Sequence, residues 1–80
     1  MKNIEIGVLY KTTKDVSLCL EPNFLSKTLL ITKDNIIQTL DCYNNIYKPN
    51  FLKVLYLDKI YYIEIIEKFF FDNDFEIINK

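Results

Sequence analysis

Two side chains that support much of protein chemistry are missing from this chain, since it contains neither histidine nor arginine. Without histidine, a serine or cysteine nucleophile lacks its usual general base, and a structural zinc site loses a common ligand. Without arginine, the side chain best suited to bidentate contacts with phosphate or guanine is missing. We therefore expect no catalytic, cofactor-binding or metal-binding residues, and no enzyme.

Cysteine is scarce as well: Cys19 and Cys42 are the only two, they lie far apart, and they form no CxxC motif. Charged residues are scattered through the first twenty positions, and no apolar run reaches eighteen residues. These features do not fit a signal peptide or a membrane span. The sequence predicts a cytoplasmic protein with free thiols and no contact with a membrane.

Alanine is absent, Gly7 is the only glycine, and prolines occur only at positions 22 and 49. The chain is instead rich in isoleucine, lysine, asparagine and tyrosine, a bias that an A/T-rich genome would produce. Half of the residues are hydrophobic, which argues against intrinsic disorder. With 80 residues, the chain is expected to form a single domain over residues 1–80, of marginal stability unless a partner or second copy adds to it.

Residues 33–47 have the clearest helical periodicity. Ile36, Leu40, Tyr43 and Tyr47 recur at helical spacing, and polar residues occupy the opposite side of the same projection. Thr32 or Asp34 can cap the start, and Pro49 follows the end. We expect a helix here.

Residues 59–71 also fit an amphipathic helix, with one broad apolar side and a polar side that carries Glu64 and Lys68 at favourable spacing. Asp58 stands where a helix cap belongs. The alternative is a β-hairpin that turns at Asp58–Lys59, but neither residue is the glycine or asparagine that such a turn prefers. The helix is the favoured interpretation.

Extended segments account for most of the remaining chain. They are expected at residues 4–10 and 16–20, which would form a hairpin, at 51–57 and 75–79, and as a short strand within 28–32. The predicted fold is α+β, with a small mixed four- to five-stranded sheet, two amphipathic helices, and the order β-β-(β)-α-β-α-β. Residues 51–79 would form a β-α-β unit. The alternative fold is a small all-β barrel of SH3-like type.

Aromatic residues are the feature that most suggests an interaction. Six tyrosines and six phenylalanines are more than so small a domain can enclose, and many lie between positions 56 and 75. Exposed aromatic rings beside charges are typical of protein–protein surfaces, although the edges of an aromatic core would give the same pattern. The predicted partner-binding residues are Tyr56, Tyr61, Lys68, Phe71 and Phe75.

Three functions remain open. The leading hypothesis is a non-enzymatic small binding protein that acts through a protein–protein surface, on another protein or a second copy of itself, such as an inhibitor, immunity or accessory factor of a phage or mobile element. The first alternative is an RNA or single-stranded nucleic-acid binding module, which the net charge of −1 does not favour. The second is a non-catalytic subunit of an enzyme complex.

Overall fold

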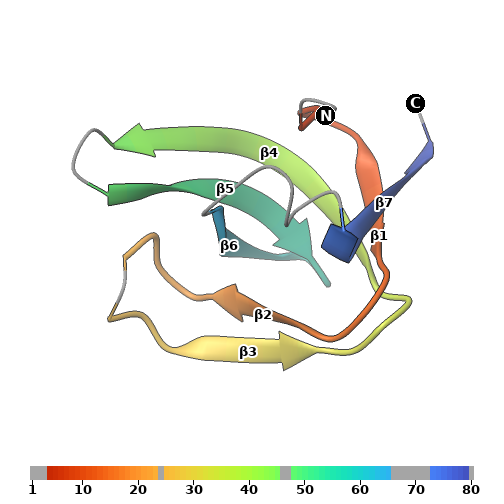
Figure 1. The fold of residues 1–80 in the computed structure, drawn as a ribbon, viewed down its shortest axis with the longest axis horizontal. Coiled ribbons are helices and arrows are strands. Elements are labelled where there is room, and N and C mark those ends of the chain that lie inside the picture. Colours follow the sequence, from red (N-terminus) through yellow and green to blue (C-terminus); the bar gives the residue numbers. More distant parts are fainter. Residues whose placement is uncertain (1–3, 24, 46–47, 66–72, 80) are drawn as a thin grey trace.

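The chain folds into one antiparallel sheet of seven strands (Figure 1). The computed structural model describes residues 4–23, 25–45, 48–65 and 73–79. Across the sheet the strands follow the order β3-β2-β6-β5-β4-β1-β7. Their bounds are β1 Leu9–Thr12, β2 Val16–Cys19, β3 Thr28–Ile31, β4 Ile36–Asn45, β5 Lys48–Tyr56, β6 Lys59–Ile65 and β7 Phe75–Asn79.

The two predicted helices are wrong wherever the structure describes them. Residues 36–45 form β4 and residues 59–65 form β6, while residues 46–47 and 66–71 lie outside the described part of the chain. In β4 the register shifts between Thr39 and Asp41, which breaks the strict alternation of inward and outward side chains. This shift explains why the segment resembles a helix: apolar residues before and after it no longer share one parity.

The β5–β6 connection is a two-residue turn. Tyr56 pairs with Lys59, and Leu57 and Asp58 between them have φ angles of 48° and 64°. Two consecutive positive φ angles identify the type I′ geometry that suits the twist of a hairpin. The predicted β-α-β unit is therefore wrong, and Asp58 is a turn residue rather than a helix cap.

The predicted mixed sheet is also wrong, because every strand pair is antiparallel. The all-β class of the alternative fold is the correct one. However, β3 and β7 stand at the two ends of the strand order, so pairing among the described residues does not close a barrel. No helix in the described ranges has the length and apolarity needed to cross a membrane.

Several strand predictions are confirmed, at 16–20, 28–32, 51–57 and 75–79. The predicted hairpin between residues 4–10 and 16–20 is wrong, because β1 pairs with β4 and β7 instead. Before β1, Gly7 has a φ of +82°, a backbone conformation that side-chain-bearing residues rarely adopt. The chain bends there, and β1 begins only at Leu9, so residues 9–10 are the part of the predicted strand that the structure confirms.

The core lies on the inner face of the bent sheet and collects side chains from all strands. Leu18, Ile37, Leu52 and Val54 are fully buried within it. The full buried cluster comprises Tyr10, Leu18, Ile31, Ile37, Leu52, Val54, Ile63, Ile65 and Phe75. Burial of this kind contributes about 25 cal/mol for each Å² of apolar surface removed from water, so these strands are held mainly by their shared inner face.

Two buried threonines bind loops to the sheet. The Thr12 hydroxyl donates to the Thr32 carbonyl at 2.9 Å and accepts the Asn35 N–H at 2.9 Å. The Thr39 hydroxyl donates to the Glu5 carbonyl at 2.7 Å. Each hydroxyl forms hydrogen bonds with backbone groups that are not paired between strands. These bonds also satisfy the hydroxyl itself, as a buried polar group requires.

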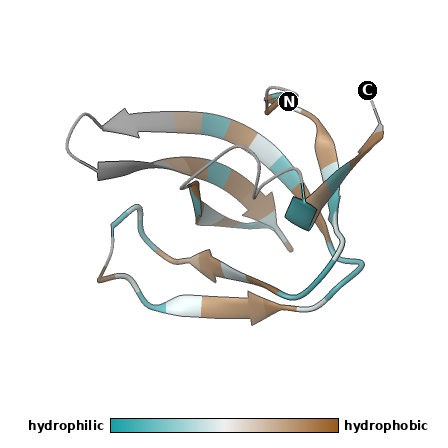
Figure 2. Cartoon of the chain, in the orientation of Figure 1, coloured by the Kyte–Doolittle hydropathy of each residue, from teal (hydrophilic) through white to brown (hydrophobic). Residues whose placement is uncertain are grey.

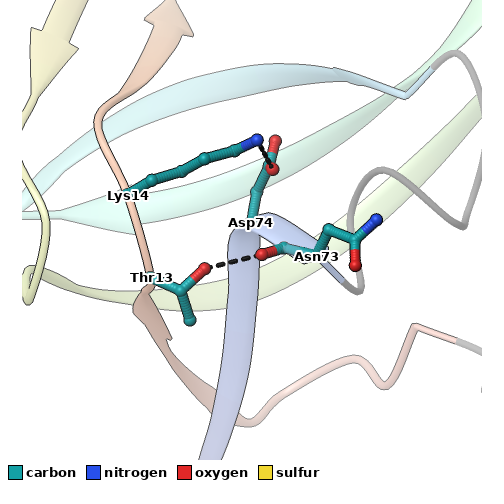
Figure 3. A network of polar contacts seen from close by, with 4 residues as sticks. All are labelled: Thr13, Lys14, Asn73 and Asp74. Atoms are coloured by element: carbon teal, nitrogen blue, oxygen red, sulfur yellow. Dashed lines mark hydrogen bonds and ion pairs between the residues drawn. The ribbon is translucent and has the colours of Figure 1, made fainter.

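The start of β7 is joined to the end of β1 by side-chain contacts (Figure 3). The Thr13 hydroxyl donates to the Asn73 carbonyl at 2.6 Å, and Lys14 Nζ lies 2.9 Å from Asp74 Oδ1. The Thr13 N–H also donates to the Asp74 carbonyl at 2.8 Å. These contacts fix the position at which β7 begins to pair with β1.

Candidate partner-binding surface

The β2–β3 hairpin is attached to the molecule by its inner face. Leu18 is fully buried and Ile31 nearly so, and Val16 packs against the same core. Pairing between β2 and β3 is unbroken from Val16–Ile31 to Cys19–Thr28, and one further pair, Cys19–Tyr62, links β2 to β6. The hairpin therefore has a fixed orientation, with β3 along its outer side (Figure 1).

The loop between these strands is ordered by its own polar groups. The Glu21 N–H donates to Ser26 Oγ at 2.8 Å, and the Leu25 N–H donates to Asn23 Oδ1 at 3.0 Å. The Ser26 hydroxyl donates to the Lys27 carbonyl at 2.8 Å. Such side-chain-to-backbone bonds replace strand pairing in tight turns, so residues on either side of position 24 are held in place.

This ordered hairpin carries apolar side chains that face solvent. Leu25 is 96% exposed and Leu30 is 63% exposed. Figure 2 shows the apolar stretch along β3, at the free side of the sheet. We call the set the leucine hairpin surface, and it consists of Leu20, Leu25, Leu29 and Leu30. Leu29 and Leu30 are successive strand residues and face opposite sides of the sheet, so these leucines follow the outer edge of the hairpin rather than one of its faces. Exposed apolar side chains that line one edge offer a contact to another chain.

Charges around the leucine hairpin surface are balanced. Lys27 and Glu21 are exposed beside the loop, and Lys33 and Asp34 are exposed beyond the other end of β3. The Asp15 carboxylate accepts the Lys33 N–H at 3.1 Å. Neither sign of charge dominates this part of the described chain. The surface therefore lacks the excess of positive charge that would attract a polyanion such as a nucleic acid.

Two of the predicted partner-binding residues lie together, at the margin of the core. Tyr56 and Tyr61 meet edge to face with ring centroids 6.1 Å apart, and both are half-buried against the core cluster. The Tyr56 hydroxyl donates to Asn35 Oδ1 at 3.1 Å. The pair fills space beside the β5–β6 turn and presents only part of each ring to solvent.

The other three predicted residues are not brought to this pair within the described chain. Phe75 is a core residue, 5% exposed, and pairs with Thr12 across β7 and β1. It offers almost no surface to a partner, because its ring is enclosed. Phe71 and Lys68 lie outside the described residues.

The leucine hairpin surface was not predicted from the sequence. Residues 20–30 contain leucines at no regular spacing, so neither a helical stripe nor strand alternation singles them out. The useful signal is local: Glu21, Asn23 and Ser26 have the side chains that hydrogen-bond to nearby backbone in turns. An apolar residue at position 25, inside such a polar turn, cannot reach a core.

Reactive groups elsewhere do not form a second site among the described residues, which contain no cluster of three potential metal ligands. Cys19 is half-buried and Cys42 is exposed. Burial raises the pKa of the Cys19 thiol, and the nearby Glu64 carboxylate raises it further. A raised pKa means less thiolate at neutral pH, so Cys19 is a weak nucleophile.

No family model, curated protein or solved structure matches the chain. The geometry of its own residues is therefore the basis on which its function is inferred.

Proposed function

We propose that the protein is a non-enzymatic binding protein and that the leucine hairpin surface is its contact with another protein chain. The observation that carries the proposal is the side chain of Leu25, which is 96% exposed although its own N–H donates to Asn23 Oδ1 and the Glu21 N–H donates to Ser26 Oγ beside it. Exposing a leucine to water opposes the hydrophobic effect by about 1.5–3 kcal/mol relative to full burial. Partner binding recovers that free energy.

The surface has the chemistry of a small interface. Its centre is aliphatic, and its rim carries both signs of charge from Glu21 and Lys27. Interfaces commonly combine an apolar centre with a polar rim. An inhibitor, immunity or accessory factor of a phage or mobile element would act in this way, by occupying the surface of a target.

Cross-linking at single positions tests the proposal. A photo-cross-linking amino acid replaces Leu25 in one variant and Ile78, which is 46% exposed on β7, in a matched control. Both variants are irradiated in cells that express the protein. We expect a cross-linked protein product from position 25 that excess wild-type protein suppresses. Equal or absent products from positions 25 and 78 would contradict the proposal.

The nucleic-acid alternative would need stacking surfaces, and Tyr56 and Tyr61 offer only part of each ring because they pack against the core and each other. It remains a prediction that oligonucleotide titration at low and high salt can test. Binding that weakens steeply with salt would support it.

A further inference from the structure

The free edge of β3 has backbone groups directed away from the molecule. The Leu20 N–H donates to the Lys27 carbonyl at 2.9 Å, which makes these two a hydrogen-bonded pair of the β2–β3 ladder. Hydrogen-bonded and non-hydrogen-bonded pairs alternate in antiparallel strands. Thr28 and Leu30 fall in the non-hydrogen-bonded pairs, opposite Cys19 and Ser17. Their N–H and C=O groups therefore point outward, to the open edge.

The two edges of the sheet differ in how they are protected from pairing. Natural edge strands commonly carry charges, prolines or bulges that prevent association. On β7, Glu76 is exposed and the pairing with β1 shifts near Leu9. On β3, the four residues are Thr-Leu-Leu-Ile, without charge or proline, and the pairing with β2 is unbroken. Of these two edges, β3 is the one suited to accept another strand.

At the β3 edge, the inner face of the sheet is only partly covered by other side chains. Leu29 pairs with the fully buried Leu18, so both lie on the inner face of the sheet. Leu29 is nevertheless 38% exposed, because no other strand of the described chain pairs with the far side of β3. A strand added beside β3 would cover Leu29 and extend the apolar layer.

The uncharged sequence of β3 suits pairing with a second copy of itself, because Thr-Leu-Leu-Ile brings no like charges together when two such edges meet. The net charge of −1 adds only weak repulsion between two copies. The flanking lysines then select the register. Pairing Leu30 with Leu30 of the second copy would place Lys27 opposite Lys33, whereas centring the contact on Leu29 places Lys27 opposite Ile31 and avoids the like-charge pair.

We propose that the partner of the leucine hairpin surface is a second copy of this chain, joined through antiparallel β3–β3 pairing. The inference rests on the proposed function and names its partner. Leu29 stands opposite Leu29 of the second copy, and Thr28 stands opposite Leu30 on both sides of the twofold axis. The outward N–H and C=O groups of Thr28 and Leu30 then form four main-chain hydrogen bonds. The result is one continuous sheet of two molecules.

The test is the molar mass of the purified protein, measured by light scattering over a range of concentrations. Thr28→Pro removes an outward N–H without removing a bond to β2, since proline is tolerated at edge positions whose N–H faces solvent. Thr28→Ala is the matched control, because it keeps the N–H. We expect dimers for the wild type and Thr28→Ala, and a dissociation constant raised at least about tenfold for Thr28→Pro.

A second variant keeps the inference testable if Thr28→Pro unfolds. Leu29→Lys would bring two ammonium groups together at the centre of the contact, which should leave monomers with an intact circular dichroism spectrum. A monomeric wild type at every concentration, or a folded Leu29→Lys variant that dimerises like the wild type, would overturn the inference. A monomer that still cross-links from position 25 to a different protein would overturn it while the proposed function stands.

Discussion

Thr12 places a hydroxyl within the apolar interior, where its side chain is fully buried. The same hydroxyl bonds the Thr32 carbonyl and the Asn35 N–H, and the Asn35 side chain in turn accepts the Tyr56 hydroxyl. Four residues from β1, β5 and the β3–β4 connection are thereby joined. At the residue scale, this network does more to fix the loops than any ion pair does, since surface ion pairs contribute little.

Replacing Thr12 with valine should therefore destabilise the protein by about 1–3 kcal/mol, because the Thr32 carbonyl and the Asn35 N–H each lose a hydrogen bond to the buried hydroxyl. Chemical denaturation measures the change in the free energy of unfolding. Ser17→Ala is the control, since Ser17 is an exposed hydroxyl on β2 and its loss should change little. Equal effects of the two substitutions would show that the Thr12 hydroxyl is not needed.

The two cysteines should differ in reactivity. Burial and Glu64 raise the pKa of Cys19, so its thiolate fraction at neutral pH is reduced, whereas Cys42 is exposed. Iodoacetamide labelling, followed by mass spectrometry of each site, should modify Cys42 first. Glu64→Gln removes a negative charge, lowers the pKa of Cys19, and should increase its labelling rate at neutral pH. An unchanged rate at Cys19 would contradict the electrostatic contribution.

At the scale of elements, the β5–β6 turn has the type I′ geometry that suits a hairpin, but its sequence, Leu57-Asp58, is unusual for that turn type. Leu57 adopts a φ of 48°, a left-handed conformation that costs a side-chain-bearing residue about 1–2 kcal/mol. Type I′ turns prefer asparagine at this position, followed by glycine. Because this signal is missing, the sequence favours a helix over a hairpin, and the alternative hairpin turns at Asp58–Lys59, one residue later than the turn in the structure.

Leu57→Asn should stabilise the hairpin by about 1 kcal/mol, because asparagine tolerates the left-handed conformation better than leucine does. Thermal and chemical unfolding provide the measurement. Lys59→Asn is the control, since Lys59 is the first residue of β6 and has no positive φ angle. If Leu57→Asn is no more stable than the wild type, backbone strain at this turn does not limit stability.

Strands whose apolar residues follow the usual strand pattern could be predicted from the sequence. Strands that depart from this pattern could not. Residues 16–20 and 51–57 show the expected patterns and form β2 and β5. In β6, Ile63 and Ile65 face the core while Ile60 and Tyr62 lie on the outer face, so both parities are apolar. An apolar run of this kind does not distinguish a strand from a buried helix.

The candidate site was less predictable than the fold. Aromatic richness pointed to Tyr56, Tyr61 and Phe75, which largely serve the core. The exposed leucines could not be identified from the sequence, because their exposure follows from the position of β3 at the end of the strand order. That position depends on which strands pair, and pairing over long sequence separations has no local signature.

For the whole molecule, the central proposal is that an ordered hairpin with an unprotected edge leaves apolar surface that a second chain covers. Of the two edge strands among the described residues, β7 carries the exposed Glu76 and an irregular register, whereas the four residues of β3 carry no charge and pair without a break. A domain of 80 residues buries a modest share of its surface, so covering Leu29 and Leu30 should add to its stability. Higher protein concentration should therefore raise the unfolding temperature.

Amide hydrogen exchange within β3 tests this claim most directly. Leu29 and Ile31 donate toward β2, so their amides should be protected at every protein concentration, whereas Thr28 and Leu30 donate outward. The account predicts that exchange at Thr28 and Leu30 slows as protein concentration rises and that Thr28→Pro abolishes this slowing at Leu30. Fast exchange at Thr28 and Leu30 at all concentrations, with Leu29 and Ile31 protected, would contradict it.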